Sequence, residues 1–292
     1  MYFYHGYALG VASAIPDKDF KGFSEFTDAS CALSLRGGEA KASESRPKPA
    51  TPPPNSPPGI WFDSAKSTIT GAEVARNGFY TWVTEASVII QKLNILDRFT
   101  ADKIEAHLFS EYRAGDYEPS TVITGSKFDN VRIDGNLLQI DTADDLSEGY
   151  STYSGMQIAF QNQFSQPSVL ALLEGRGLDA NTANTPDLRA AWEAFGEQEA
   201  LGKRTTLPTL KSAVICSFVT KISGGGYKTW GPIVAVPNFG NIYLGELIVW
   251  PWMRCLNMFR IELASGGSIC GGSAGANGTT QPPGGHPFSS DG

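Results

Sequence analysis

The chain is short of several residue types, and each shortage bears on a class of protein. It has only three histidines, His5, His107 and His286, with no HxH, HxxH or HExxH spacing. Zinc hydrolases need clustered imidazoles, so we exclude this class. The four cysteines have no CxxC spacing and are too few for a small disulfide scaffold. Cys216 and Cys255 lie in apolar runs, where we expect buried free thiols.

Clustered basic residues and long apolar runs are also missing. The 23 Lys and Arg, against 30 Asp and Glu, are scattered singly, and the formal net charge is −7. A nucleic-acid-binding face needs clustered positive charge, so we expect no nucleic-acid partner. No apolar run reaches the roughly 18 residues of a membrane-spanning helix, so we expect no membrane span.

The first residues, MYFYHGYALGVASAI, lack the positively charged start of a secretory signal. The cytoplasm is therefore the default location. A fragment of an exported protein would look the same, so an envelope or secreted location stays open. The partner that fits these exclusions is an unknown small molecule or protein.

Proline and glycine, by contrast, are abundant, and they divide the chain. Residues 46–58, RPKPATPPPNSPP, contain seven prolines, which predicts a linker or loop. Residues 265–292 are rich in glycine and poor in large apolar side chains, which predicts a flexible tail. Between these segments, 59–264 is predicted to be a β-rich body. Residues 1–45 are predicted to supply an N-terminal strand and a loop that join the main sheet.

The stretch KLNILDRFTADKIEAHLFSEY, residues 92–112, decides the fold class, because it fits both a helical and a strand period. A β-branched run at 81–91 precedes it. The dipeptide Asp134-Gly135 follows between VRI and LLQI, which is a strong hairpin signal. Because strands surround the stretch, we predict that its alternating half continues the sheet, with LDRF as the turn.

Similar alternating runs recur at 212–222, 241–250 and 255–263, so the sheet draws on distant parts of the chain. Distant pairing implies one domain. We predict a mainly β fold, a single antiparallel β-sandwich or barrel-like domain. A small helical insertion is predicted at about 166–203, where prolines occupy first-turn positions of two helical patterns.

Four segments carry a resemblance to known proteins: ASVIIQKLNILDRFTADKIEAHLFSEY, STVITGSKFDNVRIDGNLLQI, GNIYLGELIV and CLNMFRIEL. In order and in residues they resemble a family of uncharacterised bacterial β-rich proteins and, more distantly, surface domains of the choice-of-anchor P type. The resemblance implies a β fold and a connection with the cell envelope. Its motifs are structural, so it supplies no catalytic residues.

His107, with Glu105 and Glu111 on the same predicted strand face, is the candidate for proton transfer. Histidine titrates near neutral pH and can act as a general acid or base. The alternative is a surface or interface histidine.

The sequence GGSAG at 271–275 matches the G-x-S-x-G motif of serine hydrolases around Ser273. No helix follows it, so we interpret the match as chance.

Four carboxylates, Asp141, Asp144, Asp145 and Glu148, lie within eight residues and form the candidate metal site. Calcium is bound by several such oxygens. The spacing is not that of an EF-hand, and a solvated acidic loop is the alternative. These residues lead to two functional hypotheses. The first is a binding or structural β-domain; the second is a calcium-dependent hydrolase of small esters or lactones, with His107 or a carboxylate as base.

Two softer patterns remain. The segment SGGGYKTWG at 223–231 lacks the Walker and Rossmann spacings, so we predict a turn in a sheet and not a phosphate-binding loop. The six tryptophans, with WPWMR at 250–254, fit either an exposed aromatic surface for a carbohydrate, lipid or protein, or core packing.

Overall fold

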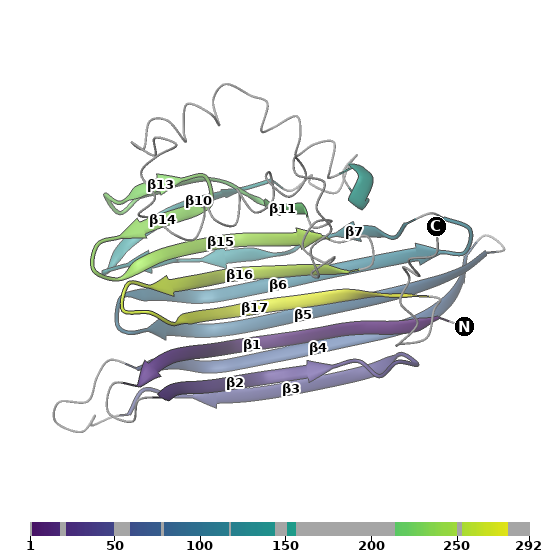
Figure 1. Cartoon of the computed structure of the whole chain (residues 1–292), viewed down its shortest axis with the longest axis horizontal. Coiled ribbons are helices and arrows are strands. Elements are labelled where there is room, and N and C mark those ends of the chain that lie inside the picture. Colours follow the sequence, from purple (N-terminus) through teal and green to yellow (C-terminus); the bar gives the residue numbers. More distant parts are fainter. Residues whose placement is uncertain are drawn as a thin grey trace, which may run out of the picture.

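The computed structural model describes residues 2–17, 22–49, 59–76, 79–116, 118–143, 151–155, 214–249 and 253–279. These residues form two antiparallel sheets stacked face to face (Figure 1). The mainly β fold is therefore confirmed, in the sandwich form. Within these ranges, no helix has the length and apolar character needed to cross a membrane.

Sheet A, drawn in front in Figure 1, has the order β13-β14-β15-β16-β17-β1-β2, and β11 pairs with β15. Its strands are β1 Phe3–Asp17, β2 Gly22–Ala32, β11 Val214–Ser217, β13 Lys228–Trp230, β14 Ile233–Val236, β15 Gly240–Val249, β16 Arg254–Leu263 and β17 Ser268–Thr279. Sheet B has the order β12-β10-β9-β6-β5-β4-β3, and β7 and β8 pair with β6. Its strands are β3 Gly38–Arg46, β4 Ile60–Arg76, β5 Phe79–Ile95, β6 Phe99–Arg113, β7 Ser120–Val122, β8 Lys127–Asp129, β9 Arg132–Ile133, β10 Asn136–Thr142 and β12 Val219–Gly224.

The β5–β6 hairpin resolves the ambiguity of residues 92–112 in favour of strands. β5 ends at Ile95 and β6 begins at Phe99, so the predicted LDRF turn is confirmed. Leu96 and Asp97 in this turn have φ values of 54° and 55°. Along β6, alternate side chains are buried between the sheets, as the strand period predicted.

The second predicted hairpin also forms, between β9 and β10. Asn136 pairs with Ile133, and the two residues between them, Asp134 and Gly135, have φ values of 49° and 79°. A two-residue hairpin turn of this type needs positive φ at both central positions, which Asp and Gly adopt at little cost. Local chemistry alone was therefore enough to predict this turn.

The predicted flexible tail at 265–292 is wrong for residues 268–279, which form β17 in the middle of sheet A. β17 pairs with β16 on one side and with β1 on the other. Its glycines make room for large neighbours: a Cβ atom on Gly275 would lie 2.3 Å from the Tyr7 ring. The high glycine content of this segment thus reflects close packing in a sheet.

Residues 1–45 contribute more to the sheets than the expected strand and loop, because they include β1, β2 and most of β3. Three other predicted segments lie wholly or partly outside the described residues. These are the helical insertion at about 166–203, residues 50–58 of the proline-rich stretch, and residues 280–292 of the predicted tail.

The core lies between the two sheets, where branched aliphatic and aromatic side chains interdigitate. The Phe99 ring of β6 and the Phe259 ring of β16 have centroids 5.6 Å apart. Fully buried aliphatic side chains surround them, among them Val88, Ile90, Ile104, Leu108, Ile242, Leu247, Leu256 and Ile261. Each contributes about 1.5–3 kcal/mol by leaving water, so the core holds the outer faces in fixed register.

A fully buried arginine, Arg254, joins the sheets at one end of the core. It begins β16 of sheet A, and its Nε donates to Thr121 Oγ1 of β7 in sheet B at 2.8 Å. One of its terminal nitrogens donates to the backbone oxygen of Pro119 at 3.0 Å. Burial lowers the pKa of Arg254 to about 10, although the charge of Glu118 opposes this shift.

Candidate functional site

His107 lies on β6, with its side chain on the outer face of sheet B. Its Nε2 lies 2.9 Å from Glu85 Oε1, and its Nδ1 lies 2.8 Å from the backbone oxygen of Thr124. Both partners are acceptors, and each ring nitrogen already lies within hydrogen-bond distance of one of them. The geometry therefore favours a surface contact over a general base.

Glu105 and Glu111 share this outer face with His107 but do not form a joint site with it. Lys103 Nζ donates to Glu105 at 2.6 Å, and Lys127 Nζ lies 3.7 Å from the same carboxylate. Glu111 is four residues further along an extended strand, roughly 13 Å from His107. The proposed catalytic roles of these three residues stay predictions.

Of the four acidic residues near 141–148, the structure describes only Asp141. It lies near the end of β10, and its backbone oxygen accepts a hydrogen bond from Thr220 Oγ1 at 3.1 Å. Asp144, Asp145 and Glu148 lie outside the described residues. The calcium site stays a prediction. Elsewhere in the described ranges, no group of three or more His, Cys, Asp or Glu side chains is arranged to hold a metal ion.

Ser273 of the GGSAG motif lies in the middle of β17, between Leu9 of β1 and Asn257 of β16. Its side chain is 2% exposed, and Oγ has no hydrogen-bond partner in the structure as described. A nucleophile elbow requires a sharp turn from a strand into a helix. β17 instead continues to Thr279, so the motif lacks elbow geometry.

Polar side chains gather on the outer face of sheet A, which points away from sheet B. The set comprises Tyr243 and Glu246 of β15 and Asn257, Arg260 and Glu262 of β16. Tyr243 pairs with Arg260 and Glu246 pairs with Asn257. Gly245, with φ of 64°, interrupts the alternation between these pairs. This bulge brings Tyr243 and Glu246, three residues apart, to the same face.

Arg260 is the centre of this polar network. Its Nε and one terminal nitrogen donate to the two oxygens of Glu246 at 3.1 and 2.9 Å, and the other terminal nitrogen donates to Glu262. Its guanidinium lies 3.8 Å from the Tyr243 ring centroid, and the Tyr243 hydroxyl donates to Glu262 at 2.7 Å. Burial lowers the pKa of Arg260, but hydrogen bonds and charges from Glu246 and Glu262 outweigh it, so the net shift is upward.

Cys255 and Tyr7 form a second polar contact on the same face. Cys255 is a free thiol, 6% exposed, as predicted, and its Sγ lies 2.7 Å from the Tyr7 hydroxyl. Burial raises the pKa of Cys255 to about 11 and also raises the pKa of Tyr7. Thiolate, not thiol, is the nucleophile, so Cys255 is unreactive near neutral pH.

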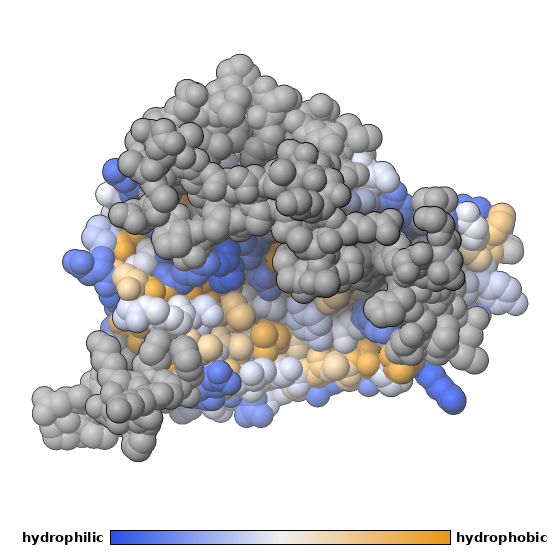
Figure 2. All heavy atoms as spheres, in the orientation of Figure 1, coloured by the Kyte–Doolittle hydropathy of each residue, from blue (hydrophilic) through white to orange (hydrophobic). Residues whose placement is uncertain are grey.

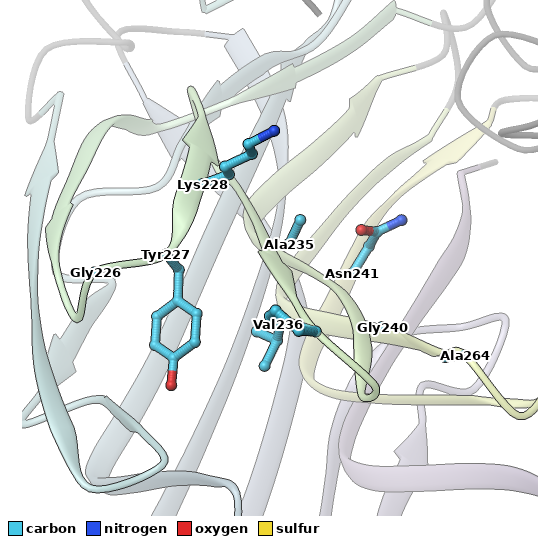
Figure 3. A pocket seen from close by; sticks show the side chains of 9 residues that line it. Gly226, Tyr227, Lys228, Ala235, Val236, Gly240, Asn241 and Ala264 are labelled. Atoms are coloured by element: carbon cyan, nitrogen blue, oxygen red, sulfur yellow. The ribbon is translucent and has the colours of Figure 1, made fainter. Parts of the chain in front are cut away.

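A hollow of about 460 Å³ lies at the end of sheet A where β13, β14 and β15 meet (Figure 3). Ala235 of β14 pairs with Lys228 on one side and with Asn241 on the other. In Figure 3 the side chains of these three residues project to the same side of the ribbon, whereas Tyr227 points the opposite way. The small side chain of Ala235 leaves the space between the Lys228 ammonium and the Asn241 amide open.

The turn that carries Lys228 is fixed to sheet B by its neighbour Tyr227. The Tyr227 hydroxyl donates to Asp134 Oδ2 at 2.8 Å, and Asp134 accepts two hydrogen bonds from Arg98, both at 2.7 Å. The Arg98 guanidinium lowers the pKa of Asp134. Lys228 and Asn241 make no side-chain hydrogen bond or ion pair in the structure as described. The fold therefore holds both side chains in place, although neither takes part in a hydrogen bond or ion pair of the described structure.

Figure 2 shows this side of the molecule in the orientation of Figure 1. Hydrophobic side chains gather over β1 and β17, and hydrophilic ones lie above them over β15. The polar network and the hollow are thus on the β15 side of the sheet.

Sequence reasoning did not single out Lys228, Asn241 or Arg260. For Asn241 and Arg260 the signal was present in the runs GNIYLGELIVW and CLNMFRIELAS, where isolated polar residues interrupt apolar ones. Recognising that Asn241 and Arg260 share one face required the register between β15 and β16, and placing Lys228 beside Asn241 required the pairing of both with Ala235.

A family model described as Domain of unknown function (DUF8256) matches residues 2–250. The match covers most of the chain, so the chain belongs to this family. No curated protein and no solved structure matches it. The expectation of an uncharacterised β-rich family is thereby confirmed.

Proposed function

We propose that this member of the DUF8256 family is a non-enzymatic binding domain whose ligand occupies the hollow between Lys228 and Asn241. The observation that supports the proposal is a difference in pairing. Lys228 and Asn241 face the hollow and have no side-chain partner in the described structure. Nearby, Arg260 is saturated by Glu246 and Glu262.

A small molecule that carries an anionic group fits this arrangement. The Lys228 ammonium can donate to an anionic oxygen, and the Asn241 amide adds a directed donor. Glu262 pairs across the sheet with Asn241 and shares the Arg260 guanidinium with Glu246, so its repulsion of an anion is reduced but not cancelled. The volume of about 460 Å³ lies within the roughly 300–1,000 Å³ range of small-molecule pockets.

The titratable groups of the outer face of sheet A suit recognition better than catalysis. A general base needs a free basic atom, and a nucleophile needs a depressed pKa or an adjacent base. The Cys255 pKa is shifted in the opposite direction, and the Tyr243 pKa is raised by burial and by its bond to Glu262. These groups therefore stay protonated at neutral pH and act as hydrogen-bond donors.

A location at the cell envelope extends this proposal. It is suggested by the resemblance of four strand segments to choice-of-anchor P type surface domains. Fractionation of cells that express the natural gene tests it: the protein is expected outside the cytoplasmic fraction, and recovery from the cytoplasm alone would reject this extension.

The test of the binding proposal is a calorimetric titration of the full chain with acetate, succinate, citrate and inorganic phosphate. Lys228→Gln is expected to weaken binding of the preferred anion about tenfold, because one charge-assisted hydrogen bond is lost. Lys66→Gln is the matched control, since this exposed lysine on β4 changes the net charge equally on the opposite side of the sandwich. Equal losses in both variants, or no binding of any anion, would reject the site.

A further inference from the structure

Aromatic side chains are stacked at the end of the sandwich where β1 begins. The Tyr2 ring lies parallel to Trp82 of β5, with centroids 4.9 Å apart and planes at 6°. It also stacks on Tyr112 of β6, at 5.9 Å and 19°. Trp82 and Tyr112 are cross-strand partners, so together they form a platform on the inner face of sheet B. Tyr2 covers this platform and is itself 6% exposed.

Sheet B continues beyond the point where sheet A ends. Figure 1 shows strands of sheet B running past the start of β1. The next residue of β5 on the inner face after Trp82 is Tyr80, because side chains alternate along a strand. The Tyr80 side chain is 62% exposed. Tyr80 thus continues the row of the aromatic platform, but among the described residues no ring covers it as Tyr2 covers Trp82.

Polar groups with unused hydrogen-bonding capacity lie beside the platform. The exposed Glu73 of β4 accepts a hydrogen bond from Trp82 Nε1 at 2.9 Å, which leaves its other oxygen available. The Tyr4 hydroxyl is buried, and it has no hydrogen-bond partner in the described structure. Burial, together with the charge of Glu73, raises the pKa of Tyr4 to about 12, so this hydroxyl remains a donor. An uncovered ring and a free acceptor oxygen on Glu73 therefore occur together.

We propose that this end of the sandwich binds a neutral saccharide, with one sugar ring stacked on Tyr80 as Tyr2 is stacked on Trp82. The C–H face of a sugar ring packs on an aromatic face, while its hydroxyls hydrogen-bond to groups at the rim, here the Glu73 carboxylate. A neutral sugar fits better than an acidic one, because Glu73 and the net charge of −7 repel anions. This site is separate from the hollow at Lys228 and extends the proposed function.

The experiment is a calorimetric titration of the full chain with cellohexaose, chitohexaose, maltohexaose and xylohexaose. At least one is expected to bind. Tyr80→Ala should then weaken that binding about tenfold, through loss of the stacking surface, while Tyr80→Phe should retain it. Because Tyr80 is mostly exposed, both variants are expected to melt like the parent.

Phe79→Ala is the matched control, and it tests whether loss of any exposed aromatic side chain at this end weakens binding. Phe79 is 45% exposed and adjacent in sequence, but its ring faces the other side of β5, where the Arg113 guanidinium lies 4.0 Å from its centroid. Equal weakening by Phe79→Ala and Tyr80→Ala would overturn the proposal, as would binding of none of the four sugars. Self-association that Tyr80→Ala abolishes would also overturn it, because a second copy would then cover the ring. Lys228→Gln should bind the sugar like the parent, which separates this site from the hollow.

Discussion

Two ion pairs, one on the outer face of each sheet, are exposed to very different degrees. On sheet B, the side chains of Lys92 and Asp102 are 60% and 47% exposed. On sheet A, those of Arg260 and Glu246 are 28% and 14% exposed. An exposed ion pair adds little to stability, because water already solvates both charges. Removing one partner of a largely buried pair leaves the other charge poorly solvated and unpaired. The same type of contact is therefore structural at Arg260–Glu246 and nearly neutral at Lys92–Asp102.

The difference in exposure between these contacts also bears on the location of the proposed binding site. On sheet B, His107, the candidate suggested by the sequence, contacts Glu85, and both side chains keep substantial contact with water. On sheet A, the Arg260 network fixes β15 against β16, and β15 carries Asn241 at the edge of the hollow. A rigid, satisfied network beside two unused polar groups is the arrangement that a preorganised binding site requires.

The largest expected effect is the loss of Arg260. Arg260→Met should lower the free energy of unfolding by about 3 kcal/mol, because Glu246 and Glu262 are left partly buried and unpaired. Lys92→Met on sheet B is the control and should cost far less, because both partners of that pair are well exposed. Urea unfolding of both variants measures the difference. Equal losses would break the comparison between the two faces.

An intermediate effect is expected from Cys255 at alkaline pH. Its pKa is raised from 9.0 to about 11 in the folded chain, so its stabilising contribution is complete below pH 9. That contribution is lost progressively as pH rises through about 11, because the unfolded chain releases the proton first. The free energy of unfolding should therefore fall between pH 9 and 11. In Cys255→Ser the slope should be shallower by up to about 1.4 kcal/mol per pH unit.

Unfolding measured at pH 7, 9, 10 and 11 tests this prediction. Below pH 8 the parent and Cys255→Ser should differ by a constant amount, since the thiol is protonated in both states. Parallel curves through pH 11 would show that Cys255 is not held protonated by burial on sheet A.

The smallest expected effect is that of His107. His107→Gln should change the free energy of unfolding by less than about 1 kcal/mol, because its partner Glu85 is 50% exposed. The variant should also leave any hydrolysis of chromogenic esters at the level of the parent. A loss of several kcal/mol would place sheet B on a par with sheet A. A loss of ester hydrolysis confined to this variant would restore His107 as a catalytic residue.

Much of the fold could be predicted from the sequence, because strand period and turn chemistry are local properties. The alternation in β6, the LDRF turn and the hairpin at Asp134-Gly135 each depend on residues within one hairpin. The candidate site could not be predicted in the same way. Lys228 and Asn241 face one hollow only because each pairs with Ala235, a register that neither segment encodes alone.

The glycine-rich segment at 268–279 shows most clearly what the sequence determined and what tertiary structure decided. Composition alone predicts a flexible segment there, because few apolar side chains are available to offset the conformational entropy that is lost on ordering. β1 and β16 pair with the two edges of the segment, and their bulky rings fill the space above its glycines. The segment therefore becomes a central strand. Strand periodicity and turns follow from contacts between sequence neighbours, so they can be predicted from the sequence. Pairing of β17 with the first strand joins residues more than 250 positions apart, and only the folded structure reveals it.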